Sequence, residues 1–399
     1  MMGDLAVAPT RRDGPPTANP LDEPQASRTL RPSATRTIRI AFVSDPHCYR
    51  IAVGPWSLLG KRALGWANLV WNRRNHFDAA CFARCVHRAQ DIEADLLLVG
   101  GDLTQTSLGS EFRIARRILS QFAGPKVVIP GNHDRYTYAA QFTRRFERWL
   151  RDVGAVDEFP AWFDLDNDLR LIALDPTRPS VNARGTLPGL QLRRFQALLD
   201  QAKDQGVVPL VACHYPAVVP PGIHHKRSHR MTNEDAVRQA LVDHQAPLVF
   251  ANGHIHRMWV YQPAEGPHVL SLNPGACGSF SHEAPLGNGF LELVFEAEAG
   301  GTRSLTVRAH RQALTGRWLT HDLAYVPDLM LLGRDSSALR HVTLPRQPGG
   351  PDSDQAGAEG DDDPAAEGLD DTAAEGGSTE LRKNETAQQD ESPSLRARL

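Results

Sequence analysis

The 399-residue sequence predicts an α/β sandwich with a mixed arrangement of strands. Two observations support this fold class. Short apolar runs rich in β-branched residues alternate with longer segments of helical periodicity, as is typical of α/β folds. Towards the carboxyl end, consecutive runs have the pattern of paired antiparallel strands. We therefore expect one folded domain over residues 38–315.

Six buried strands are expected, and each ends at a polar or metal-binding residue. They are residues 37–45, 94–102, 126–134, 169–175, 208–214 and 246–254. Helical spacing is present in residues 77–93, 111–124 and 190–206, and two of these segments end near a glycine, a common helix terminator. Antiparallel strands are expected over residues 268–280, 290–298 and 304–312.

The two ends of the chain differ in composition from this central part. Residues 1–37 are rich in Pro, Arg, Thr and Ser and lack the apolar core of a secretory signal peptide, so we predict a disordered leader. Residues 351–399 contain 14 acidic and four basic side chains, which predicts a disordered acidic tail over residues 347–399. The remainder then has 40 basic and 33 acidic residues, a net charge of about +7.

Composition also restricts the cellular location and the binding partners expected for the protein. The sequence contains no run of 18 apolar residues, so no membrane span is predicted. Its five cysteines are an odd number without the spacing of a disulfide framework, which favours a reducing cytoplasm. The basic excess is modest and no aromatic stacking platform stands out, so no nucleic-acid partner is predicted. Residues 316–346 have enough apolar positions to dock on the body or on a second subunit, and the oligomeric state stays open.

Side chains able to bind metal follow the predicted strands in order. They are Asp45 and His47, Asp102, Asn132 with His133 and Asp134, His214, and His254 with His256. Taken singly, an aspartate after a strand is often a helix N-cap. In open α/β sheets, however, the ligand crevice lies beyond the carboxyl ends of the strands, so these side chains are expected to converge. Carboxylates, imidazoles and an amide without a thiolate suit Mn, Fe, Zn or Co.

The order D-x-H, G-D, G-N-H-D, a lone H and G-H-x-H resembles the calcineurin-like metallophosphoesterase superfamily, in its bacterial phosphodiesterase-like branch. The resemblance covers roughly residues 38–300 and implies a four-layer α/β/β/α sandwich with mixed sheets. It also implies two divalent metal ions, Mn, Fe, Zn or Co. One ion would be held by Asp45, His47 and His256, the other by Asn132, His214 and His254, with Asp102 bridging them.

The chemistry implied by this resemblance is hydrolysis of a phosphodiester or pyrophosphate by a metal-bridged hydroxide. His133 is expected to give a proton to the leaving alkoxide. Asp134 is expected to orient that imidazole, although a capping role for Asp134 fits equally well.

The basic segment 222–230 follows His214 and contains three histidines among three cationic residues. A metal-binding histidine tract is one interpretation, and a solvated basic loop near the phosphate pocket is the favoured one. On the second interpretation its cations clamp a substrate phosphate. We therefore predict His225 and Lys226, together with Arg135, as substrate-binding residues.

Residues 50–77 form an insertion between the first two metal motifs. Within residues 50–76 the segment has five basic residues, no acidic residue and three of the seven tryptophans of the chain. Wound as a helix, its apolar side chains cover a wide arc. The pattern allows two interpretations. The segment is either an amphipathic cap packed over the domain or an interfacial helix on an anionic membrane. Residues 60–74 also resemble an insert of bacterial metallophosphoesterases with unassigned or lipid-linked substrates.

Two functions are compatible with these features. The leading hypothesis is a dinuclear metallophosphoesterase acting on a cyclic nucleotide or a lipid-linked phosphate, cytoplasmic or peripheral at the inner membrane face. The alternative is a catalytically inactive phosphoesterase-fold scaffold that binds a protein or a membrane. A scaffold would be expected to lose metal ligands or the histidine of G-N-H, and the sequence retains both.

Overall fold

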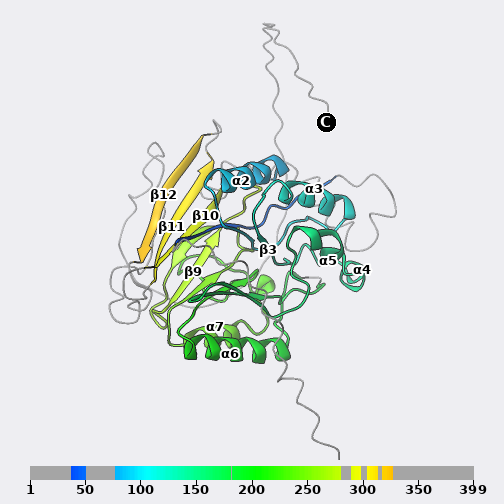
Figure 1. Ribbon diagram of the computed structural model, residues 1–399. Helices are drawn as coiled ribbons and strands as arrows, with labels where there is room; N and C mark the ends of the chain where they lie inside the picture. Colours follow the sequence, from blue (N-terminus) through cyan, green and yellow to red (C-terminus); the bar gives the residue numbers. More distant parts are fainter. Residues whose placement is uncertain are drawn as a thin grey trace, which may run out of the picture. The chain divides into compact units, whose positions relative to one another are not determined.

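Two six-stranded mixed sheets form the centre of the computed structural model (Figure 1). The structure describes residues 37–50, 77–180, 182–279, 289–297, 303–312 and 317–326. The first sheet has the strand order β12-β11-β10-β1-β2-β3. Its parallel part consists of β1 (Thr37–Val43), β2 (Leu96–Val99) and β3 (Lys126–Val128). Its antiparallel part consists of β10 (Gly289–Ala297), β11 (Arg303–Gln312) and β12 (Trp318–Val326).

The second sheet has the strand order β4-β5-β6-β7-β9-β8. Four parallel strands form its middle: β5 (Leu169–Leu174), β6 (Val208–Cys213), β7 (Leu248–Ala251) and β9 (Val269–Pro274). Antiparallel strands close both edges, β4 (Ala161–Asp166) and β8 (Met258–Tyr261). Parallel strands point their carboxyl ends to the same edge, which places the loops after them together.

Helices cover the outer face of each sheet (Figure 1). On the first sheet lie α2 (Ala79–Asp91), α3 (Gly109–Leu119) and α5 (Arg145–Leu150), and the short α4 (Tyr138–Phe142) packs against α5. On the second lie α6 (Gly189–Asp204) and α7 (Glu234–Asp243). Two short 3-10 turns, Arg151–Val153 and Arg227–His229, complete the list of helical elements in the described residues.

Three hydrophobic clusters fill the interfaces between these layers. The cluster between the two sheets includes Phe42 and Leu171. A second cluster, with Phe82 and Phe112, joins the first sheet to α2 and α3, and a third, with Phe195, joins the second sheet to α6 and α7. Burial of this apolar surface is the main force that holds the layers together. The layer order is α/β/β/α, and the fold class predicted from the sequence is confirmed.

The six predicted buried strands are β1, β2, β3, β5, β6 and β7, but several end earlier than expected. β1 ends at Val43 and β7 at Ala251, two and three residues before the first candidate ligand that follows each. The edge strands β4, β8 and β12 and the helices α4, α5 and α7 were not predicted. β8 is apolar but only four residues long, and polar residues interrupt the apolar pattern of β4 and β12, so none of the three has a long apolar run.

Several expectations concern residues outside the described ranges. These are the leader, the acidic tail, residues 51–76 of the insertion and residues 327–346 of the expected docking segment. Residues 318–326 of that segment form β12, which pairs with β11 in the first sheet. In the described part of the chain, no helix has both the length and the apolar composition that a bilayer crossing requires.

Candidate metal centre

The loops after β1, β2, β3, β6 and β7 meet at one edge of the sandwich. Main-chain hydrogen bonds join them: the Asp45 amide donates to the Gly101 carbonyl at 3.0 Å, and the Gly253 amide donates to the His214 carbonyl at 3.0 Å. The two sheets are also joined here, because the His254 amide donates to the Asp45 carboxylate at 3.0 Å. The positions of the ligand side chains are therefore fixed by the backbone.

The first ligand cluster contains Asp45, His47 and His256, whose ligand atoms lie within 4.8 Å of one another. His256 Nε2 is 3.0 Å from His47 Nε2 and 3.3 Å from Asp45 Oδ1. Phe77, the last residue of the insertion, packs its ring against His47 at a centroid distance of 4.6 Å. Two imidazole nitrogens and a carboxylate oxygen directed at one point form a suitable donor set for a divalent transition metal.

The second ligand cluster contains Asp102, His214 and His254. His214 Nε2 lies 3.3 Å from Asp102 Oδ2, and His47 Nε2 of the first cluster lies 3.7 Å from the same oxygen. The Asp102 carboxylate thus stands between the two clusters. Asn132 lines the same pocket, and its Oδ1 is buried without a hydrogen-bond partner in the described residues. A buried acceptor without a donor is unfavourable unless a ligand occupies it, so the residues fit a bound cation.

Main-chain carbonyls fix the tautomers of two of these ligand histidines. Because a carbonyl can only accept, the ring nitrogen beside it must be the donor. His214 Nδ1 therefore donates to Gly100 at 2.7 Å and leaves Nε2 as the ligand atom. His254 Nε2 donates to the carbonyl of His229 at 2.8 Å and leaves Nδ1. Partners of this kind set the ring orientation and the basicity of metal-binding imidazoles.

The pKa values in the second cluster depend on one another. Burial lowers the pKa of His214, but the adjacent Asp102 carboxylate outweighs burial and raises that pKa to about 9. Burial by itself raises the pKa of Asp102, but the nearby His214 and His133 outweigh burial and hold that pKa well below its ordinary value. Burial, followed by the charge of His214, lowers the pKa of His254 well below its usual range. An ionised carboxylate and a neutral imidazole are the forms that bind metal.

Five of the candidate ligands have a left-handed backbone, which is unusual for residues with a side chain. They are Asp45 (φ 54°), His47 (φ 45°), Asp102 (φ 54°), His254 (φ 72°) and His256 (φ 59°). Each such residue costs about 1–3 kcal/mol and persists only where the surroundings impose it, most often at functional sites. The left-handed turns explain why the strands end before the ligands.

Glycines beside the ligands allow the loops to approach closely. A Cβ on Gly131 would lie 2.1 Å from Asp102 Oδ1, and a Cβ on Gly253 would lie 2.5 Å from Asp45 Oδ2. Gly101 has a left-handed backbone with φ of 99°, and a Cβ there would lie 2.6 Å from the Gly131 amide nitrogen. The glycines before Asp102, Asn132 and His254 in the three motifs are therefore required by contact with the carboxylates and the neighbouring backbone.

The geometry of Asp134 differs from the expected role as the group that orients His133. Its buried carboxylate accepts hydrogen bonds from the amides of Thr104 and Gly131, both at 2.9 Å. It thereby joins the loops after β2 and β3. Burial, followed by repulsion from Asp102, raises the pKa of Asp134 to about 7. The His133 ring is instead oriented by the carbonyl of Gln105, which accepts from Nδ1 at 2.7 Å.

Arg135 does not take the expected place in the substrate pocket. Its side chain is buried and forms ion pairs with Glu147 at 2.8 Å and Asp175 at 2.9 Å. The guanidinium also lies 5.8 Å from the ring centroid of Phe146. Two carboxylates satisfy the guanidinium inside the protein, so Arg135 stabilises the loop after β3. Arg135 is not among the residues that line the pocket, which differs from the expected substrate contact.

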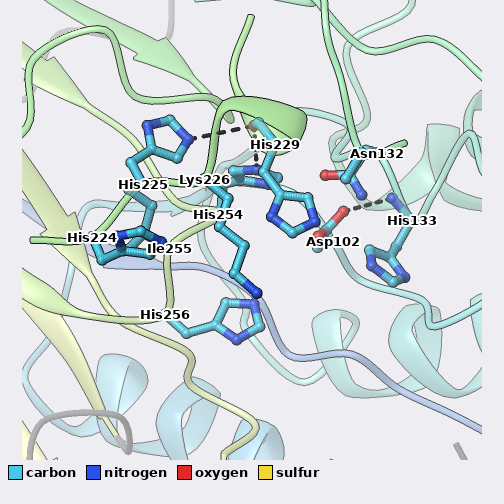
Figure 2. Close-up of a pocket in the computed structure, with 11 residues that line it drawn as sticks. Asp102, Asn132, His133, His224, His225, Lys226, His229, His254, Ile255 and His256 are labelled. Atoms are coloured by element: carbon cyan, nitrogen blue, oxygen red, sulfur yellow. Dashed lines mark hydrogen bonds between the residues drawn. The ribbon is translucent and has the colours of Figure 1, made fainter. Parts of the chain in front are cut away.

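A pocket opens beside the ligands and is walled by the loop 222–230 (Figure 2). The cavity has a volume of about 240 Å³ and its lining includes Asp102, Asn132, His133, His224, His225, Lys226, His229, His254 and His256. Burial lowers the pKa of His225 to about 4, so this side chain is uncharged near neutral pH. Lys226, which is exposed, therefore supplies a positive charge to the wall. The structure thus brings the predicted ligands, His133, His225 and Lys226 to one place.

The four-layer fold and its paired ligand clusters define the class of metal-dependent phosphoesterases. A model of the family described as calcineurin-like phosphoesterase matches residues 38–258, more than half of the chain. The chain belongs to this family, as predicted, and is a phosphoric ester hydrolase.

Several proteins of named function are similar to this chain. A probable glycerophosphodiester phosphodiesterase GpdQ of Arcobacter nitrofigilis is 28% identical over 211 residues, which covers 48% of this chain and 71% of the relative. Among solved structures, a dimetal phosphatase from Danio rerio aligns with a TM-score of 0.49 and 12% identity, over 72% of this chain and 99% of that one. The purple acid phosphatase PPD1 of yellow lupin aligns with a TM-score of 0.47 and 11% identity, over 72% of this chain and 54% of that one.

Sequence reasoning missed the groups that orient the ligands. The carbonyls of Gly100, Gln105 and His229 bind the imidazoles of His214, His133 and His254. Every residue has a carbonyl, so no residue type signals this role. The Ser44 hydroxyl, which donates to Asp45 at 2.6 Å, is a side-chain partner that its position directly before the D-x-H motif could have indicated.

Proposed function

We propose that the protein is a two-metal phosphodiesterase. The observation that carries this proposal is the position of Asp102, whose Oδ2 lies 3.3 Å from His214 and 3.7 Å from His47, members of two separate clusters. A carboxylate in this position is suited to bridge two cations. The 28% identity to a relative named as a probable glycerophosphodiester phosphodiesterase supports a phosphodiester as the substrate class.

The donor set assigns each proposed ion its ligands. Asp45, His47 and His256 would hold one ion, Asn132, His214 and His254 the other, and Asp102 both. Two divalent ions supply a water activated as nucleophile and neutralise the charge of the phosphoryl oxygens. Nitrogen and oxygen donors without thiolate suit Mn, Fe, Zn or Co.

His133 is the proposed proton donor to the leaving group. Its Nδ1 is bound to the Gln105 carbonyl, so Nε2 is the atom that can hold and release a proton. The ring is stacked on Tyr136 at a centroid distance of 5.6 Å and lines the pocket, which limits its rotation. A ligand atom of His133 lies within 4.8 Å of those of His47 and Asp102. His133 therefore stands beside the proposed ions, where it can hold a proton for the leaving group.

His225 and Lys226 are the proposed substrate-binding residues of the pocket wall. In Figure 2 the Lys226 side chain points into the pocket, where its ammonium group can bind a phosphate or another anionic part of the substrate. His225 is uncharged and largely buried, and its Nε2 faces the His229 carbonyl at 3.4 Å. Its proposed contribution to binding is therefore to hold the pocket wall in place beside Lys226. A cyclic nucleotide and a lipid-linked phosphate both present such an anion.

The test is hydrolysis of bis-(p-nitrophenyl) phosphate by protein reconstituted with Mn²⁺, together with the metal content per chain. Asn132→Ala should lose one of two bound ions and most of the activity. Asn167→Ala, at the turn between β4 and β5, is the matched control and should retain both. A folded wild-type protein that binds metal but hydrolyses no phosphodiester would favour the scaffold alternative, and one ion per wild-type chain would refute the two-metal site.

A further inference from the structure

Two aromatic side chains protrude from α4 into solvent. Tyr138 and Phe142 lie one helical turn apart and are 78% and 90% exposed. Together with Leu190 they are the exposed large hydrophobic residues among those the structure describes. Aromatic rings contribute a large apolar surface that is usually buried, so a pair at this exposure indicates an interaction site.

Helix α5 contacts α4, and α3 contacts α5 in turn (Figure 1). Both α3 and α5 are rich in arginine. Seven arginines lie in these helices or at their ends: Arg113, Arg116 and Arg117 in α3, Arg144 at the N-cap of α5, Arg145 and Arg148 in α5, and Arg151 in the 3-10 turn that follows. The two helices are in direct contact, since the Arg113 guanidinium lies 5.4 Å from the ring centroid of Trp149. We call these seven arginines, together with Tyr138 and Phe142, the aromatic–arginine surface.

Little negative charge compensates these arginines. Arg116 pairs with Asp152 at 2.6 Å, and Arg144 lies 3.9 Å from the buried Glu147. The other five arginines of the surface form no ion pair with the described residues. The surface therefore carries a net positive charge beside its apolar pair, a composition that matches a layer of anionic groups over an apolar phase.

The aromatic–arginine surface is joined to the catalytic pocket. Tyr136, two residues before α4, stacks on the ring of His133, which lines the pocket. The Tyr136 amide also donates to the Ser107 hydroxyl at 2.9 Å, and Arg145 donates to the Ser107 carbonyl at 3.0 Å. A partner bound at α4 would thus be linked through Tyr136 to His133 of the pocket.

We propose that the aromatic–arginine surface docks the enzyme on an anionic phospholipid bilayer. Tyr138 and Phe142 enter the headgroup region, and the arginines contact lipid phosphates. Two protruding rings suit a deformable bilayer better than the ordered bases of a nucleic acid, which stack on aromatic platforms along a groove. Docking does not depend on the proposed phosphodiesterase activity. If both hold, the substrate is a phosphodiester presented at a lipid surface.

The test is sedimentation of the full-length protein with vesicles of phosphatidylglycerol and phosphatidylcholine, compared with vesicles of phosphatidylcholine alone. We expect binding to the anionic vesicles that is lost at high salt, since the screening length falls from about 10 Å at 0.1 M to about 3 Å at 1 M. Arg148→Gln/Arg151→Gln should weaken partitioning by about fivefold for each arginine removed. Tyr138→Ser/Phe142→Ser should weaken it at every salt concentration.

Matched controls lie on the helices of the opposite layer. Leu190→Ser removes an exposed apolar side chain from α6, and Arg193→Gln/Arg238→Gln removes two exposed arginines from α6 and α7. These variants should bind vesicles as the wild type does. All variants should hydrolyse bis-(p-nitrophenyl) phosphate at the wild-type rate, which separates a failure of docking from a failure of catalysis.

Four results would overturn the proposal. They are a wild-type protein that does not sediment with anionic vesicles, surface variants that bind unchanged, controls that lose as much binding as the surface variants, and arginine-dependent binding to duplex DNA that is tighter than binding to vesicles.

Discussion

The metal ligands and the loop that walls the pocket differ in how firmly they are held. Asp45, Asp102 and His214 are at most 1% exposed, and main-chain hydrogen bonds connect their loops. In the loop 222–230, Lys226 and its neighbour Arg227 are exposed. The buried floor can hold cations in one geometry, whereas the wall can adjust to a substrate. Changes in the floor should therefore affect the rate of the chemical step, and changes in the wall should affect substrate affinity.

The largest effect is expected from Asp102→Ala, because both clusters lose the carboxylate that stands between them. Phosphodiester hydrolysis should fall by at least about 10⁴-fold, since each ion contributes several kcal/mol to transition-state stabilisation. Steady-state kinetics and metal content measure this effect. Asp200→Asn, which removes an exposed carboxylate from α6, should change neither. If the Asp102→Ala variant keeps both ions and its activity, Asp102 does not serve the two clusters.

A smaller effect with a distinct signature is expected from His133→Asn. Loss of a proton donor should reduce hydrolysis of an alkyl phosphodiester by about 10²–10³-fold. Hydrolysis of bis-(p-nitrophenyl) phosphate should fall much less, because p-nitrophenolate leaves without a proton. His87→Asn on the exposed side of α2 is the control. Equal losses on the two substrates would show that His133 acts other than as a proton donor.

The close approach of the floor loops can be tested with Gly131→Ala. Its methyl group would lie 2.1 Å from Asp102 Oδ1, so the loop must shift. We expect a loss of about 1–3 kcal/mol in the free energy of unfolding and a fall of about tenfold in metal affinity. Gly189→Ala at the start of α6 meets only an Arg193 nitrogen at 3.7 Å and should be neutral or stabilising in thermal unfolding.

The smallest effect is expected in the wall, from Lys226→Ala. Lys226 is exposed, so its interaction with a substrate anion is screened, and KM should rise by about three- to tenfold with little change in kcat. Arg227→Ala removes an adjacent charge that does not line the pocket and should leave KM unchanged. A fall in kcat without a change in KM would show that Lys226 acts in the chemical step and not in substrate binding.

The sequence by itself determined the fold class and the set of candidate ligands. Asp45, Asp102 and His254 follow runs whose apolar pattern marks them as buried strands, and parallel strands end at a common edge. Each ligand is also a side-chain type with its own chemistry, which a sequence displays directly. For these reasons the family and the grouping of the ligand motifs could be predicted without coordinates.

Only the tertiary structure decided which polar groups face the pocket and which hold the loops together. Arg135 and Asp134 lie within two or three residues of Asn132, yet one pairs with two buried carboxylates and the other binds loop amides. The carbonyl of His229, 25 residues before His254, sets the tautomer of that ligand. Such roles depend on distances between segments that are remote in the chain and on groups that every residue shares, so composition and spacing contain no record of them.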